Sequence, residues 1–241
     1  MRSDVLERIC LSIRESSVRG FEEKLRRAHD LDPVMVELRL DDLSLDESRE
    51  ALSLASEYPV KVIATIRSVR EGGGFRGDDE TMIKSLRELS GRADLVDVEY
   101  RLCEFDPRIV DHLRSNGAMV IASRHVLTPI LKIDQISELA EEMRRVADLV
   151  KVVYTATNTV VALGIIDLYA KEWAKGRLIS FCMGERWSLT RPLSVILGAP
   201  FTYASLDNEP TGPGQLSFTE LLHSIEKLMV MPRIAPDRHH R

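Results

Sequence analysis

The stretch AMVIASRHVLTPILKIDQISELAEEMRRVADLVKVVYTA, residues 118–156, contains two short apolar runs separated by a longer amphipathic segment. The runs cover 118–123 and 149–155, and their β-branched residues are typical of buried strands. The segment between them, 136–147, has the apolar spacing of a helix. The stretch therefore predicts a strand–helix–strand unit, and parallel strands joined by a helical crossover.

The same alternation continues in both directions along the chain. Further strands are predicted at 8–13, 34–40, 60–67, 94–100, 177–183 and 200–205, and further helices at 44–58, 78–91, 106–117, 158–176 and 217–230. Eight such units in 241 residues predict an α/β fold, a single-domain (β/α)8 TIM barrel. A doubly wound open sheet is the alternative, but it usually has a glycine-rich phosphate turn after its first strand. No such turn is present in ICLSIRESSVRG, residues 9–20.

We expect the barrel to be the catalytic domain and to cover residues 1–230, followed by a disordered tail over 231–241. Net charge is −5, which argues against a general nucleic-acid or anionic-membrane partner. The three cysteines are scattered and odd in number, so neither a disulfide framework nor a zinc site is expected. No apolar run is long enough to span a membrane, and the first ten residues are too charged for a signal peptide. These features predict a cytoplasmic protein.

Several predicted strands carry charged residues near their ends. In VELRLD, Glu37 and Arg39 are two residues apart and share one face, which must be the barrel interior because the alternate residues are apolar. Asp97 and Glu99 show the same spacing in the fourth strand, and Lys151 lies within the apolar sixth. Because lysine is rarely buried without a partner, its position needs an explanation. The non-catalytic alternatives are a structural ion pair between Glu37 and Arg39 and, for Lys151, an extended side chain that reaches the barrel mouth or a pair with Glu99.

The loops that follow the strands also contain candidates. Arg67 and Glu71 follow the third strand, next to a triple glycine at 72–74 that is expected to form a flexible loop. His125 ends the fifth strand, and Arg191 begins a short helix after the seventh. A loop rich in proline and glycine follows the eighth strand and has the composition of a lid. Active sites of such barrels lie at this end of the strands.

These residue types indicate a particular chemistry. Burial, together with Arg39 or Arg67 nearby, would favour a neutral Lys151 amine, the nucleophile that forms a Schiff base with a carbonyl. His125 is a candidate for proton transfer, and the arginines indicate an anionic substrate. A class I aldolase-like barrel that acts on an anionic keto substrate fits the same residues. A barrel without catalytic activity, used only for binding, is a further alternative. Neither a metal nor a cofactor is expected.

At these residues the chain resembles type I 3-dehydroquinate dehydratase, the Schiff-base enzyme of the shikimate pathway. The matching segments occur in family order and span nearly the whole chain: VELRLD (36–41), TIRSVREGG (65–73), DLVDVEY (94–100), VIASRH (120–125), VKVVYTA (150–156), SLTR (188–191) and TGPGQLS (211–217). The resemblance implies a TIM barrel that dehydrates 3-dehydroquinate to 3-dehydroshikimate without a cofactor. It also implies a homodimer.

The resemblance assigns roles to individual residues. Lys151 would form the imine with the substrate ketone, His125 would act as general acid and base, and Glu71 would orient this histidine. The residues implied in substrate binding are Ser12, Glu37, Arg39, Arg67, Arg191, Thr211 and Gln215. The chain departs from the family pattern at two places: Thr211 stands where serine is common, and Arg124 and Val126 flank the histidine in place of asparagine and aspartate.

Overall fold

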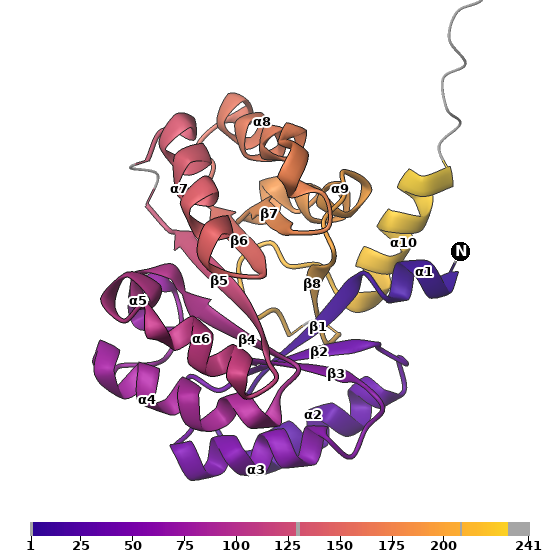
Figure 1. Cartoon of the computed structure of the whole chain (residues 1–241). Coiled ribbons are helices and arrows are strands. Elements are labelled where there is room, and N and C mark those ends of the chain that lie inside the picture. Colours follow the sequence, from indigo (N-terminus) through magenta and orange to yellow (C-terminus); the bar gives the residue numbers. More distant parts are fainter. Residues whose placement is uncertain (1, 129–130, 208, 231–241) are drawn as a thin grey trace, which may run out of the picture.

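The computed structural model describes residues 2–128, 131–207 and 209–230. Eight parallel strands pair in the order β7-β6-β5-β4-β3-β2-β1-β8 and curl into a nearly closed barrel (Figure 1). The strands are β1 Ile9–Arg14, β2 Met35–Arg39, β3 Lys61–Thr65, β4 Leu95–Glu99, β5 Met119–Val126, β6 Leu149–Tyr154, β7 Leu178–Cys182 and β8 Thr202–Ser205. Each lies where the sequence predicts a strand, and the TIM barrel is confirmed.

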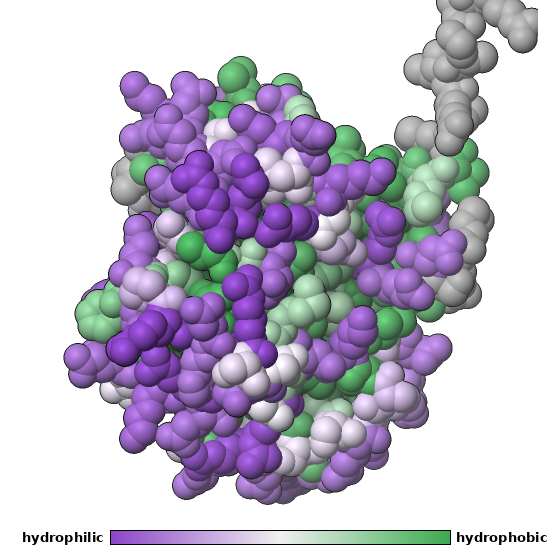
Figure 2. Space-filling model, in the orientation of Figure 1, coloured by the Kyte–Doolittle hydropathy of each residue, from purple (hydrophilic) through white to green (hydrophobic). Residues whose placement is uncertain are grey.

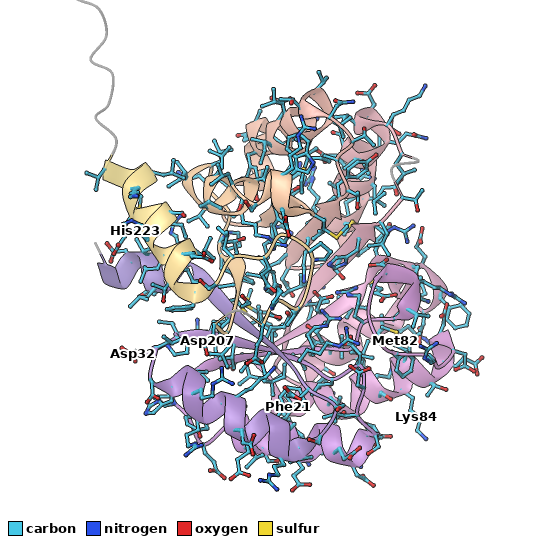
Figure 3. All side chains as sticks on the ribbon, turned by 180° about the vertical axis from the view of Figure 1, so that it is seen from behind. Phe21, Asp32, Met82, Lys84, Asp207 and His223 are labelled. Carbon is cyan, nitrogen blue, oxygen red and sulfur yellow. The ribbon has the colours of Figure 1, made fainter. Side chains whose placement is uncertain are left out.

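Helices surround the barrel on its outer side (Figure 1). They are α1 Arg2–Leu6, α2 Val18–His29, α3 Leu45–Ala55, α4 Asp79–Leu89, α5 Tyr100–Phe105, α6 Arg108–Ser115, α7 Ile133–Val146, α8 Thr159–Asp167, α9 Thr190–Ile196 and α10 Phe218–Val230. Their amphipathic pattern decides their orientation: in α4, Met82 is fully buried against the barrel, whereas Lys84 is exposed (Figure 3). Hydrophilic residues accordingly cover most of the face seen in Figure 2.

The barrel separates two apolar cores. The larger core lies between the strands and the helices, where side chains such as Val36, Leu38 and Val150 pack outward. The smaller one fills the barrel around the first inward residues of the strands: Cys10, Met35, Ile63, Leu95, Ile121, Leu149, Ile179 and Phe201. Because strand side chains alternate, the inward residue two positions later belongs to the next layer. That layer is largely polar and buried, with Ser12, Glu37, Thr65, Asp97, Ser123 and Lys151.

Two predictions about local structure are wrong. The segment 158–176 is not one helix, because α8 ends at Asp167 and two short 3₁₀ turns follow. This break lets the Tyr169 hydroxyl reach Ser180 on β7 and the Trp173 indole reach Glu141 on α7. The triple glycine forms a tight turn and not a flexible loop. A Cβ on Gly73 would lie 2.0 Å from the carbonyl oxygen of Arg67, so the backbone approaches too closely for a side chain.

Helix α2 was not predicted, although its signals are present in the sequence. Ser17 caps its first turn, and Phe21, Leu25 and Ala28 form its buried stripe. The predicted tail 231–241 lies outside the described residues. Over the part of the chain that the structure describes, no helix has the length and apolar character needed to cross a membrane.

Candidate active site

A cavity of about 420 Å³ opens at the carboxyl ends of the strands. It brings together nearly all of the site residues that the sequence predicts, from β2, β5, β6, α9 and the segments after β3 and β8. The predicted residues that line it are Glu37, Arg39, Arg67, Glu71, His125, Lys151, Arg191, Thr211 and Gln215. Ser12 lies behind Glu37, to which its hydroxyl donates a hydrogen bond of 2.5 Å.

Lys151 occupies the centre of this cavity on β6 and is 4% exposed. Its Nζ lies 3.0 Å from Oδ2 of Asp97 and 3.6 Å from Oε1 of Glu37. The alternative prediction, that Lys151 pairs with Glu99, is wrong. The carboxylate of Glu99 instead accepts hydrogen bonds from Ser68 and Arg101. Among the described residues the ion-pair partners of Nζ are therefore the carboxylates of Asp97 and Glu37, and Arg67, which was predicted to lie nearby, contacts the other oxygen of Asp97.

Asp97 links Lys151 to a larger network. Its Oδ1 accepts hydrogen bonds of 2.5 Å from both Arg67 Nη2 and Ser123 Oγ. Burial raises the pKa of this carboxyl, but the charges of Arg67 and Lys151 outweigh it and leave the pKa below its ordinary value. Asp97 is therefore a permanent anion beside the lysine.

Arg67 is shared between carboxylates. Besides Asp97, its guanidinium lies 3.2 Å from Glu71 and 3.4 Å from Glu99. Burial lowers the pKa of Arg67, yet these three anions more than compensate and hold it above its ordinary value. A guanidinium engaged in this way has little capacity left for a further anion.

Glu71 and His125 form a pair. Oε2 of Glu71 accepts from the backbone N–H of His125 at 2.9 Å and faces Nδ1 of its ring at 3.2 Å. With Glu71 ionised, Nδ1–H donates to this oxygen, which leaves Nε2 as the free acceptor. Burial, followed by the charges of Arg67 and Lys151, lowers the pKa of His125 well below 6.5. The imidazole is thus neutral at physiological pH and can accept a proton.

The second oxygen of Glu71 faces Arg124, whose Nη1 lies 3.3 Å from Oε1. Arg124 is the residue that departs from the family pattern, and it takes part in the orientation of the carboxylate. Burial raises the pKa of Glu71, while Arg67 opposes this shift.

Arg191 differs from the other cations of the site. It is 4% exposed, and its Nε and Nη2 donate only to the carbonyl oxygens of Gly214 and Pro213, at 3.2 and 3.4 Å. Among the described residues no carboxylate lies within ion-pair distance. Burial lowers the pKa of its guanidinium to about 10. A buried cation that has no carboxylate partner among the described residues, on the wall of a cavity, favours an anion in that cavity.

The loop after β8 closes over the barrel. Thr211 donates to Ser12 at 2.9 Å, and Oε1 of Gln215 accepts from the backbone N–H of Thr211 at 2.7 Å. Gly214 passes so close to the segment after β7 that a Cβ there would lie 2.3 Å from the carbonyl oxygen of Gly184. The loop therefore lies over the cavity, in the position that the sequence predicts for a lid.

The outer side of this loop is anchored to α2 by charge. Arg27 pairs with Asp207 and Glu209, and Lys24 bridges Glu209 and Glu15 at 2.5 and 2.6 Å. Figure 3 labels Asp207 at this place, above Phe21 of α2. These pairs are partly exposed, so each contributes little by itself.

Some residues of the cavity wall were not predicted. Thr65 donates to Glu37 at 2.9 Å, and Asp41, which does not itself line the cavity, pairs with Arg39. The predicted alternative for Arg39, an ion pair with Glu37, is therefore not the one found. Tyr203 on β8 places its ring 4.0 Å from Nζ of Lys151. An aromatic residue in an apolar strand carries no signal of such a role, whereas the alternation that identifies Glu37 also identifies Thr65.

Comparison with known proteins gives a consistent result. The model of the type I 3-dehydroquinase family matches residues 9–230. A 3-dehydroquinate dehydratase from Methanothermobacter thermautotrophicus is 27% identical over 222 residues, which cover 92% of this chain and 97% of the relative. The corresponding protein from Pyrococcus abyssi is 34% identical over 189 residues, or 78% of this chain and 84% of the relative.

Comparison with solved structures gives the same result as comparison of sequences. A type I 3-dehydroquinate dehydratase from Clostridium difficile, determined with covalently modified comenic acid, superimposes with a TM-score of 0.83 at 25% identity. The match covers 92% of this chain and 91% of that one. The 3-dehydroquinate dehydratase from Geobacillus kaustophilus gives a TM-score of 0.81 at 22% identity, with 94% and 92% covered, and supports the fold.

Proposed function

Because the chain belongs to the type I 3-dehydroquinase family and is a 3-dehydroquinate dehydratase of the shikimate pathway, we propose that its reaction proceeds through an imine on Lys151. The Nζ lone pair attacks the C3 ketone of 3-dehydroquinate, and the carbonyl oxygen leaves as water. His125 is proposed to take the proton that Nζ loses before the attack and to return it to the carbinolamine hydroxyl, which leaves as water; Asp97 and Glu37 face Nζ throughout. The cationic imine then withdraws electrons from C2 and acidifies its proton.

His125 is the proposed base for this C2 proton. Its depressed pKa keeps Nε2 unprotonated, and Glu71 holds the ring through Nδ1. Loss of the C1 hydroxyl as water follows, and His125 supplies the proton that this leaving group needs. Hydrolysis of the imine releases 3-dehydroshikimate and restores Lys151.

Arg191 is the proposed site for the substrate carboxylate. Binding of this anion would give the buried guanidinium the partner that the described residues do not provide. Glu37, Arg39 and Arg67 are proposed to face the substrate hydroxyls. Thr211 and Gln215 would close the lid over the bound ring, with Ser12 joining the lid to Glu37.

One observation carries the imine mechanism: a buried lysine lines the same cavity as a histidine held by Glu71 and an arginine that has no carboxylate partner among the described residues. Incubation with 3-dehydroquinate and borohydride, followed by peptide mass spectrometry, tests it. We expect the reduced adduct on Lys151 in the wild type and no adduct in Lys151→Met. Turnover in the wild type without any trapped adduct would refute the imine. An adduct lighter than that of 3-dehydroquinate by one water would show dehydration on the enzyme and would argue against an aldolase-like reaction.

Three broader predictions accompany this mechanism. We propose residues 1–230 as the catalytic domain and the cytoplasm as its location. The three cysteines of the chain are free and buried, which suits a reducing compartment. A homodimer, which the resemblance implies, stays a prediction, and light scattering of the purified chain tests it.

A further inference from the structure

Three aromatic side chains form a cluster beside the catalytic lysine. Tyr203 belongs to β8, Phe201 immediately precedes that strand, and Phe181 belongs to β7; each is 3% exposed. The ring centroids of Phe201 and Tyr203 are 5.6 Å apart at 71°, and those of Phe181 and Tyr203 are 6.5 Å apart at 60°. These edge-to-face arrangements fix each ring plane against its neighbour.

Two of these rings each carry a cation on their face. Nζ of Lys151 lies 4.0 Å from the centroid of Tyr203, and the guanidinium carbon of Arg191 lies 4.1 Å from that of Phe181. Both distances are well inside the range of a cation–π interaction, and both cations are buried, where such interactions are strongest. The two cations that the mechanism needs therefore lie on one connected aromatic surface.

We propose that the ring of Tyr203 is a catalytic group that stabilises the cationic imine on Lys151, and that Phe181 is a positioning residue that holds Arg191 for the substrate carboxylate. This proposal rests on the imine mechanism above and adds to it the groups that support its two cations.

The number of N–H bonds on Nζ of Lys151 explains why the ring of Tyr203 matters most once the imine has formed. Condensation converts the ammonium group and the ketone into a protonated imine and water, so the nitrogen goes from three N–H bonds to one. That single N–H cannot satisfy both Asp97 and Glu37, which the ammonium faces at 3.0 and 3.6 Å. The contact with the face of Tyr203 needs no hydrogen and is retained. The ring thus favours the cationic imine over the neutral carbinolamine that precedes it.

The hydroxyl of Tyr203 is not needed for this role. It is buried and has no hydrogen-bond partner among the described residues. Burial raises the pKa of this phenol well above its ordinary value, and the charge of Glu37 adds to the effect. The group stays protonated, so Tyr203 contributes its ring face and not a proton.

Phe181 acts on the other cation. Because Arg191 has only two long hydrogen bonds to backbone carbonyls, the ring beneath it is the main contact that fixes its plane. A leucine in place of Phe181 would leave the guanidinium buried but free to tilt, which would weaken its grip on a carboxylate.

Three variants test the proposal: Tyr203→Phe, Tyr203→Leu and Phe181→Leu. Each is assayed for kcat, for KM and for the fraction of chains trapped on Lys151 by borohydride at saturating 3-dehydroquinate. We expect Tyr203→Phe to stay within about threefold of the wild type. Tyr203→Leu should lose about tenfold in kcat and in trapped fraction, which corresponds to about 1.4 kcal/mol. Phe181→Leu should raise KM about tenfold with an unchanged trapped fraction.

Fluorinated phenylalanines at position 203 provide a test that does not depend on shape. Successive fluorines weaken the negative face of the ring, so the trapped fraction should fall stepwise from none to three fluorines. Equal trapping along this series, or a loss in Tyr203→Phe as large as in Tyr203→Leu, would overturn the role of the ring. An unchanged KM in Phe181→Leu would overturn the role of Phe181. Absence of any adduct in the wild type is a separate result, which refutes the proposed imine itself.

Discussion

Replacing Arg191 with methionine should stabilise the protein while it weakens substrate binding. The structure predicts both the gain in stability and the loss in substrate affinity, because the guanidinium is buried and has no carboxylate partner in the described chain. Burial lowers its pKa from 12.5 to about 10, and a shift of this size corresponds to about 3 kcal/mol against the charged form. The group is charged in both the folded and unfolded states at pH 7. The full cost therefore applies there; it begins to fall as the pH rises past about 10 and is gone only above 12.5.

Methionine is shorter than arginine but similar in volume, and it has no charge, so Arg191→Met removes this cost. The variant also loses two long hydrogen bonds, worth about 1 kcal/mol together, and the contact with Phe181, worth about 1 kcal/mol. The balance is a gain of about 1 kcal/mol, or a rise of about 2–4 °C in Tm. Loss of a charge-assisted bond to the substrate carboxylate, about 1.5–3 kcal/mol, should raise KM about 10- to 100-fold.

Thermal denaturation of the free enzyme and steady-state kinetics measure the two effects separately. Denaturation with saturating product adds a control, because the product should raise the Tm of the wild type more than that of the variant. A variant that melts below the wild type and keeps its KM would refute the reasoning. Such a result would mean that the guanidinium supports the fold and not the substrate.

Three further predictions concern the base and the lid. Glu71→Gln should lower kcat about tenfold with little change in KM, because the amide holds Nδ1–H of His125 less strongly; an equal rise in KM would contradict this orienting role. Since burial and Arg67 lower the pKa of His125 well below 6.5, kcat/KM should stay flat as the pH falls from 8 to 6.5, and a midpoint at 6.5 in the pH profile would contradict it. Thr211→Val removes the hydrogen bond to Ser12 and should raise KM about fivefold, by about 1 kcal/mol, which steady-state kinetics with Thr211→Ser as control would measure.

The barrel could be predicted because its strands are short, β-branched and regularly separated by amphipathic helices. The inward direction of Lys151 and Glu37 also follows from the sequence, since strand alternation depends on local geometry alone. The partner of Lys151, in contrast, does not follow from the sequence. It depends on the tilt of the strands and on how far each side chain reaches across the barrel, and these select Asp97 and not Glu99.

Tyr203 illustrates a second limit of the sequence. Strands β6 and β8 are not neighbours in the sheet, so no pairing pattern places Tyr203 near Lys151. Their contact arises only because the barrel brings inward residues of distant strands together at its axis. The break after α8 has a similar origin, because hydrogen bonds of Tyr169 and Trp173 to other elements override the helical pattern of 158–176.

Two buried arginines in one cavity show why residue type alone could not separate their roles. Both Arg67 and Arg191 were predicted to bind substrate. Arg67 faces three carboxylates, and its pKa is held above the ordinary value. Two of these carboxylates connect it to the catalytic pair: Asp97 contacts Lys151, and Glu71 contacts His125. Arg191 faces none in the described chain, and its pKa is lowered. The unpaired guanidinium is the one with electrostatic capacity for an anion, whereas Arg67 is suited to hold the nucleophile and the base in a fixed relation.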